Sequence, residues 1–149
     1  MSPTVRNVLA VVAAFVAGAL VNMALVSVGP HVVPPPPGAD LTNPAGIKAA
    51  LPHLRPAHFV FPFLAHAANA FVGALVAHLL AATRRDAFAW GLGGLTFVGG
   101  VAAAFLIPAP GWFVALDLVV AYLPMAWLGI QVGRHLRPAS PAASPAGRA

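Results

Sequence analysis

The sequence predicts an all-α membrane protein: a bundle of four transmembrane helices with a proline-rich outer loop that carries a short surface helix. Of the 149 residues, 60% are hydrophobic and only 7% are charged, whereas a soluble domain carries about 25% charged residues. The apolar residues fall into four runs of about 20 residues or more, long enough for a helix to cross about 30 Å of hydrocarbon. The runs lack the polar–apolar alternation of membrane barrel strands.

The runs predict helices at residues 5–28, 59–82, 87–107 and 112–132. The first run, in which Arg6 is followed by an apolar stretch, also has features of a secretory signal. It is long for a signal core, however, and Pro30 follows its small-residue end, which makes a poor cleavage context. We therefore expect the run to remain as a membrane helix; cleavage would remove Asn22.

The outer loop, residues 29–58, is the only sizeable segment expected outside the membrane. Its four consecutive prolines, 34–37, predict a short, stiff polyproline segment. Asn43 followed by Pro44 is typical of a helix start, because the first can act as the N-cap and the second suits the first helical position. A short surface helix is therefore expected to run through residues 47–51.

The basic residues predict the orientation. Six arginines lie at the N-terminus, between the second and third runs, or after the fourth: Arg6, Arg84, Arg85, Arg134, Arg137 and Arg148. The outer loop holds only Lys48 and Arg55. Because positive residues collect on the cytoplasmic side, both termini are expected in the cytoplasm. Abundant arginine and alanine indicate a bacterium, and hence the bacterial cytoplasmic (inner) membrane.

Composition excludes several kinds of site. The chain has no cysteine, which excludes disulfides, thiolate nucleophiles and iron–sulfur ligation. The net charge of +5 comes from residues that flank the runs and form no continuous face, so no nucleic-acid partner is expected. We expect a single transmembrane domain over residues 1–137 and a disordered cytoplasmic tail, rich in Pro, Ala and Ser, over 138–149.

Four polar residues are expected at a similar depth in the outer half of the bundle. Asp117 is the only acidic residue inside the runs. At about 1.5 Å per residue, Asp117, Asn22 and His66 lie about 8–12 Å from the outer ends of their runs, and Asn69 lies one turn deeper. Helical periodicity turns them toward stripes of small residues. We therefore expect Asp117 to lie within one bridging water of His66, Asn69 or Asn22.

Two further residues of the fourth run, Pro124 and Tyr122, bear on the helix around Asp117. Pro124 removes the hydrogen bond to the carbonyl of Val120 and predicts a helix kink. Tyr122 falls roughly opposite Asp117 on a regular helix, so we expect its side chain to face lipid or a second subunit.

Two functions fit the polar cluster, because an ionisable residue inside a membrane is by default a functional-site hypothesis. The first is a structural or accessory protein, in which the cluster fixes the register of the helices. The alternative is a proton-linked transporter or channel subunit, in which Asp117 and His66 share a proton. An enzyme is less expected, because no nucleophile or metal-ligand set accompanies the two residues.

No cofactor or metal is predicted. Haem with two histidine ligands needs them on facing helices, whereas the membrane histidines His66 and His78 share one helix, about 120° apart. A zinc site in the outer loop stays open as an alternative, although the spacing of its candidate ligands matches no zinc motif. These candidates are His31, His53, His58 and Asp40.

Three segments carry a resemblance to a known family. They read HFVFPFLAHA at residues 58–67, LDLVVAYLPMAW at 116–127 and GPHVVPPPPGAD at 29–40. The chain resembles a family of small, uncharacterised four-helix bacterial integral membrane proteins over most of residues 5–133. The resemblance implies the same four-helix architecture and brings no activity, cofactor or site residue with it.

The expected partners are the lipid bilayer and, through self-association, a second copy of the chain or a larger membrane complex. Four helices of this size form a thin bundle, and the glycine stripes offer more close-packing surface than one bundle uses.

Overall fold

The computed structural model describes residues 1–137, so the predicted disordered tail at 138–149 lies outside the described residues. The described part of the chain is 82% helical and forms no strand. Four of its helices are long and apolar enough to cross a membrane. These findings confirm the all-helical class.

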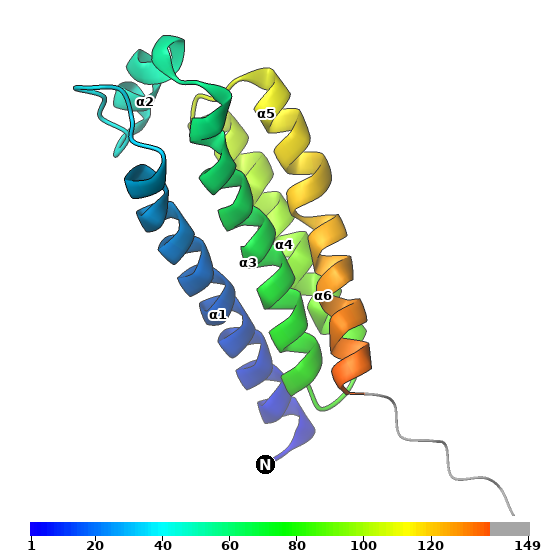
Figure 1. Cartoon of the computed structure of the whole chain (residues 1–149). Coiled ribbons are helices and arrows are strands. Elements are labelled where there is room, and N and C mark those ends of the chain that lie inside the picture. The colour runs from blue at the N-terminus through cyan, green and yellow to red at the C-terminus, as the bar shows by residue number, and fades with distance from the viewer. Residues whose placement is uncertain (138–149) are drawn as a thin grey trace, which may run out of the picture.

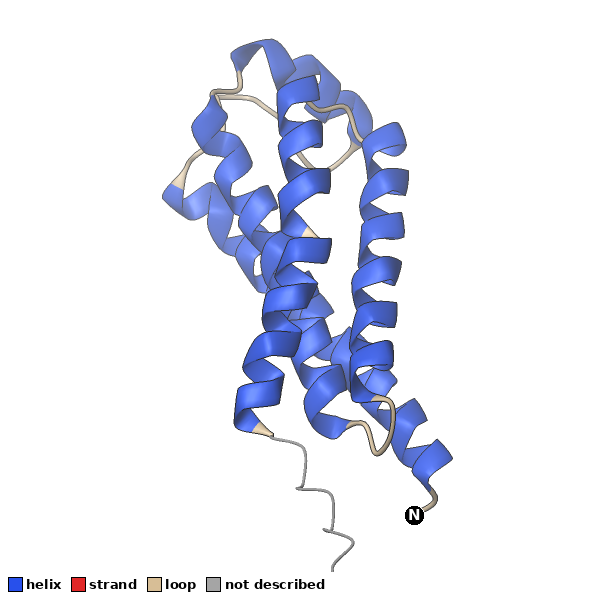
Figure 2. Cartoon of the chain, turned by 90° about the vertical axis from the view of Figure 1, so that its right-hand side faces the viewer, coloured by secondary structure: helices blue, strands red, loops and turns tan. Residues whose placement is uncertain are grey.

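The elements, in chain order, build four helical columns that stand side by side (Figure 1). They are α1 (Pro3–Val32), α2 (Pro44–Ala50), the 3₁₀ turns η1 (Leu51–His53) and η2 (Pro56–Phe59), α3 (Val60–Leu80), α4 (Arg85–Leu106), α5 (Gly111–Leu116), the π-helical segment η3 (Asp117–Ala121) and α6 (Leu123–Leu136). The short helix α2 lies at one end of the bundle, which we call the α2 end. The N-terminus and the end of α6 lie at the other, which we call the terminal end (Figures 1 and 2).

The first helix is longer than the prediction of residues 5–28. It continues through Pro30 to Val32, because a proline without an N–H removes only one hydrogen bond so close to a helix end. The N–H of Val33 then donates to the carbonyl of Gly29 at 2.8 Å and completes the last turn. This extension places the end of α1 beside the loop that follows it.

The short helix in the loop starts where the sequence predicts. The side chain of Asn43 accepts a hydrogen bond of 2.8 Å from the N–H of Gly46, and Pro44 is the first helical residue. The proline needs no partner at this position, and the asparagine satisfies a free N–H of the first turn.

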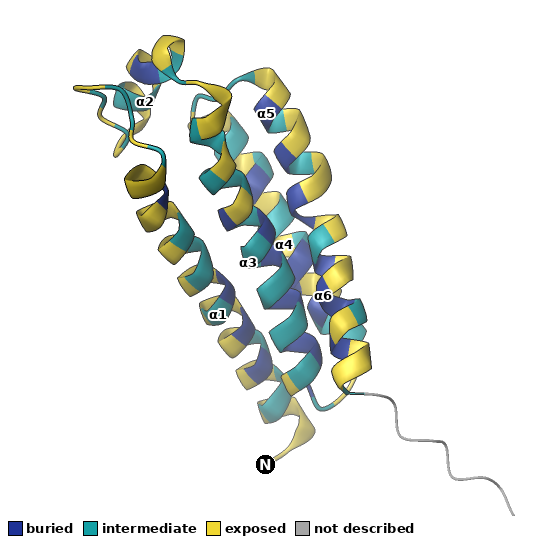
Figure 3. Ribbon diagram, in the orientation of Figure 1, coloured by how far each residue is buried: buried dark blue, intermediate teal, exposed yellow. Residues whose placement is uncertain are grey.

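Helix α3 is the centre of the bundle, since it packs along α1, α4 and α6, while α1 touches α4 only slightly. The inward faces are buried and the outward faces exposed (Figure 3). The main core cluster consists mostly of alanine: Ala14, Ala74, Ala77, Ala89, Leu92, Ala126 and Ile130. Large apolar side chains such as Leu20, Phe105 and Val119 point outward and are exposed. The core is therefore built from small residues and the exterior is apolar.

Glycines mark the closest helix contacts. A Cβ added at Gly129 of α6 would meet the backbone carbonyl oxygen of Phe71 and lie 3.1 Å from the backbone nitrogen of Leu75. Backbone atoms of α3 cannot rotate away as a side chain can. Only glycine therefore allows α6 to approach α3 this closely.

We predict that Gly129→Ala destabilises the protein by about 1–3 kcal/mol, the usual cost of overpacking a core. Gly91→Ala is the matched control, because a Cβ at this exposed position of α4 meets nothing within 4 Å. This control should stabilise the helix slightly, since alanine loses less backbone freedom than glycine. Denaturant unfolding in detergent measures both; equal stability of the two variants would contradict the close contact.

Candidate functional site

Asp117 and His66 meet inside the bundle at the α2 end. His66 Nδ1 lies 2.8 Å from Asp117 Oδ2 and 3.0 Å from Oδ1. Asp117 keeps 8% of its side-chain surface exposed and His66 keeps 30%. An ionised carboxylate only accepts hydrogen bonds, so in this pairing the proton of a neutral imidazole sits on Nδ1. The other ring nitrogen, Nε2, then carries a free lone pair.

Tyr122 completes the site, and the prediction that it faces lipid or a second subunit is wrong. Its side chain is buried, and its hydroxyl donates a 3.0 Å hydrogen bond to Asp117 Oδ2. Its ring stacks on that of His66, with the ring centroids 5.6 Å apart. The three side chains form one connected unit, which we call the Asp–His–Tyr site.

The π-helical segment explains why Tyr122 turns inward. On a regular α-helix, residues five apart point about 140° away from each other. Residues Asp117–Ala121 instead form a π turn, whose i→i+5 hydrogen bonds bring such residues back to one face. The sequence predicted a kink at Pro124. The structure has instead the π turn before it and a non-helical backbone at Tyr122. Because Pro124 has no N–H for the carbonyl of Val120, the regular ladder cannot continue there.

Gly100 of α4 makes room for the tyrosine. A Cβ at this position would lie 2.8 Å from Tyr122 Cε2 and still closer to the hydroxyl end of the ring. The sequence predicted only packing stripes of small residues, and the contact of Gly100 with a polar side chain follows from the π turn.

Asn69 and Asn22 are not hydrogen-bonded to the Asp–His–Tyr site in the described residues. Within residues 1–137 their side chains form no hydrogen bond with Asp117 or His66, and both are half-buried. Asn69 lies on α3 against Gly18 of α1, since a Cβ at Gly18 would meet its amide. Similar depth along the bundle did not produce a hydrogen bond between these residues, because Asp117 lies on the column of α5 and α6 while Asn22 lies on α1, and α1 makes its main contacts with α3.

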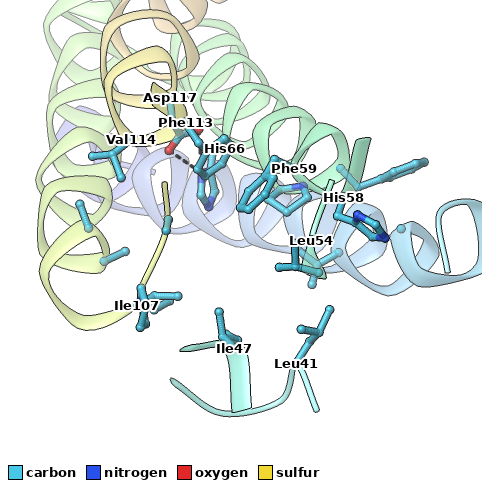
Figure 4. A pocket seen from close by; sticks show the side chains of 18 of the residues that line it. Leu41, Ile47, Leu54, His58, Phe59, His66, Ile107, Phe113, Val114 and Asp117 are labelled. Atoms are coloured by element: carbon cyan, nitrogen blue, oxygen red, sulfur yellow. Dashed lines mark hydrogen bonds and ion pairs between the residues drawn. The ribbon is translucent and has the colours of Figure 1, made fainter. Parts of the chain in front are cut away.

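The Asp–His–Tyr site borders an apolar cavity of about 360 Å³. The cavity lies between the ends of α1, α3, α4 and α5, and the loop between α1 and α3 covers it with Leu41, Ile47 and Leu54. Asp117 and His66 belong to its wall. In Figure 4 the edge of the His66 ring that carries Nε2 points away from Asp117, toward the space between Ile47, Leu54 and Ile107.

Polar contacts hold the covering loop in place. Asp40 accepts hydrogen bonds from the Thr42 hydroxyl at 2.6 Å and the Thr42 N–H at 2.8 Å, and these bonds hold the pKa of Asp40 below its ordinary value. His58 accepts a 2.9 Å bond from the Arg55 N–H, and its Nε2 lies 3.1 Å from the carbonyl of Pro34. Sequence reasoning missed this cover; three apolar residues in a proline-rich loop were the available signal.

A second polar group at the terminal end was also missed. His78 of α3 is buried, with its Nδ1 2.9 Å from Asp86 Oδ1, and Arg134 of α6 pairs with Oδ2 of the same carboxylate. Asp86 falls at the start of α4, where a helix favours an acid. The long sequence separation of the three residues gave no reason to group them.

No metal cluster occurs in the described part of the chain: residues 1–137 hold no group of three or more His, Cys, Asp or Glu side chains placed for a metal ion. Comparison of the chain with protein-family models, curated proteins and solved structures finds no match. The chemistry of the site therefore rests on its geometry.

We predict that Gly100→Ala displaces Tyr122 from Asp117, whereas Gly99→Ala, whose Cβ would meet nothing within 4 Å, leaves it in place. Tyr122 is the only tyrosine in the chain, so ¹³C-labelled tyrosine gives one ring signal by NMR. That signal should move in the first variant and stay in the second. An unmoved signal in both variants would contradict the tight contact at Gly100.

Proposed function

We propose that this protein spans the bacterial cytoplasmic membrane four times and binds a small, mostly apolar molecule next to His66, with a proton exchanged on the His66–Asp117 pair. It would act as a proton-linked transporter or channel subunit. The observation that carries the proposal is an apolar cavity that ends on a partly buried carboxylate–imidazole pair whose free nitrogen points inward.

The four apolar columns support the membrane location. They contain 30, 25, 22 and 26 residues, and about 20 suffice to cross the hydrocarbon. The exposed large side chains on their outward faces suit lipid contact. The terminal end carries most of the arginines, so we place it, together with the N-terminus, in the cytoplasm.

The shape of the cavity supports an apolar ligand. Its volume of about 360 Å³ lies in the range of small-molecule sites, which combine an apolar wall with a few polar groups. Because α1 and α4 touch only slightly, we propose that the ligand reaches the cavity from the bilayer between these helices. A hydrogen-bond donor on the ligand would bind Nε2 of neutral His66.

The pair supports a proton-linked role. When His66 gains a proton, both ring nitrogens become donors, and the charge is balanced by Asp117 at 2.8 Å. Protonation would therefore remove the acceptor for the ligand while the pair stays bonded. This change couples ligand release to proton uptake at one residue.

A structural or accessory role is the competing function. Both oxygens of Asp117 contact His66 and one also binds Tyr122, so the site ties α3 to the column of α5 and α6. Such bonds fix helix register without further chemistry.

We also propose that the protein forms a homodimer. Gly91, Gly94 and Gly99 of α4 would meet nothing within 4 Å if a Cβ were added. Gly91 and Gly94, three residues apart, share a face of α4, and this face is open to a second copy of the chain.

We predict saturable binding of 5-bromoindole, an apolar molecule with a single N–H donor, in proteoliposomes. Its bromine should quench the fluorescence of Trp112, which packs against Phe59 of the cavity wall, once Trp90 and Trp127 are replaced by Phe. The N-methylated probe has no donor and should bind about tenfold more weakly, the value of one good hydrogen bond. Ala104→Phe should abolish saturation by filling the cavity, whereas Ala102→Phe, outside it, should not.

We predict that the affinity of the wild type for 5-bromoindole depends on pH and is lower when His66 carries its second proton, because the protonated ring has no acceptor nitrogen. Asp117→Asn should fold normally and lose this pH dependence, since an amide cannot balance an imidazolium. Asp117→Leu should cost about 1–3 kcal/mol by leaving His66 and Tyr122 unpaired. A saturable but pH-independent wild type would reject the proton link, and equal, non-saturable quenching by both probes would favour the structural role.

A further inference from the structure

Two arginines meet the C-terminal end of α3. Arg6 Nε donates to the carbonyl of Leu80 at 3.0 Å. Arg137 Nη1 donates to the carbonyls of Leu79 at 2.5 Å and Ala81 at 3.2 Å. The last carbonyls of a helix lack partners within it and carry partial negative charge. The carbonyls at the end of α3 therefore bind two guanidinium groups, one from α1 and one from the end of α6.

Arg85 joins them from the start of α4. Its Nη1 lies 3.4 Å from the carbonyl oxygen of Arg137, to which it donates. Desolvation, and after it the positive charges of Arg85 and Arg6, hold the pKa of Arg137 below its ordinary value. All three residues are half-buried, whereas the neighbouring Arg84 is exposed.

No acidic side chain balances these three charges. The sequence contains three acidic residues, and each has other partners. Asp40 binds Thr42 and Asn43 at the α2 end, and Asp117 belongs to the Asp–His–Tyr site. Asp86, the nearest to the terminal end, contacts His78 and Arg134. Three like charges held together without a counter-charge form a strong site for an anion.

The unused donors match a phosphate group. A guanidinium has five N–H donors in a rigid fork that fits carboxylate and phosphate oxygens. The contacts within residues 1–137 engage Nε of Arg6 and one Nη each of Arg85 and Arg137, which leaves further N–H groups on each side chain. Because the carbonyls already hold these side chains, binding a phosphate costs little further side-chain entropy.

We propose that Arg6, Arg85 and Arg137 form a binding site for a negatively charged phosphate group, supplied by an anionic phospholipid headgroup or by free phosphate. Leu80 and Leu136 are the last residues of α3 and α6, and their exposed apolar side chains suit contact with the acyl chains of a lipid. In the proposed orientation the site faces the cytoplasmic leaflet, which is rich in anionic lipid. The site lies at the opposite end from the cavity and does not depend on the ligand proposed there.

Native mass spectrometry of the full chain in mild detergent tests the site by titration with phosphatidylglycerol and, as its net-neutral counterpart, phosphatidylcholine. We expect tighter binding of the anionic lipid. Arg6→Gln and Arg137→Gln should each weaken it about tenfold, as expected for a charged hydrogen bond. Arg84→Gln is the matched control: it removes the same charge from the same end of the bundle, and should change the affinity less than about threefold, because an exposed charge acts through a screened field.

Inorganic phosphate at millimolar concentration distinguishes the two sources. Displacement of the lipid would show that any phosphate fills the site, and lipid binding without displacement would identify the headgroup as the ligand. The proposal is overturned if Arg84→Gln weakens binding as much as Arg6→Gln, or if both lipids bind equally.

Because Gln variants also lose contacts to α3, Arg6→Lys and Arg137→Lys keep the test independent of folding. They retain the charge and lose the fork, so their affinity should fall between that of the wild type and the Gln variants. If the Gln variants do not fold, comparison with Arg84→Lys decides: an equal affinity in all three Lys variants would overturn the site.

Discussion

The close approach of three helices to α3 is the constraint on which the rest of the structure depends. In the proposed bilayer setting, apolar side chains gain nothing by leaving lipid for a protein interior, so helices associate by packing and polar bonds. The alanine core and the glycines facing α3 let backbones touch. Large apolar side chains are thereby left on the outside, where lipid can solvate them.

Because α3 packs against all its neighbours, it contributes a residue to both polar groups. His66 near one end contacts Asp117, and His78 near the other end contacts Asp86. In each case the histidine belongs to α3 and the carboxylate to a neighbouring column. Few polar side chains lie inside the bundle, so these two contacts distinguish one arrangement of the helices from alternatives with similar packing.

The fourth column shows how a local defect produces a site. Pro124 prevents a regular helix, the chain adopts a π turn before it, and Tyr122 rotates onto Asp117. Gly100 accepts the ring on the neighbouring helix. π turns are rare and frequent at functional sites. Here the turn sets a phenol, a carboxylate and an imidazole beside an apolar cavity, while the arginines gather at the far end of the same bundle.

The sequence by itself determined the all-helical class, the four apolar columns and the start of α2, because run length, composition and an Asn–Pro cap act locally. It also brought Asp117 and His66 to one depth, since helical rise is constant. Only the tertiary structure decided which neighbours meet. Depth does not say which neighbour a side chain meets, so Asn69 contacts α1 at Gly18 instead of Asp117. A regular helical wheel cannot foresee a π turn, so Tyr122 was expected on the wrong face. The cavity and the arginine site depend on contacts between residues far apart in the chain, for which no local periodicity exists.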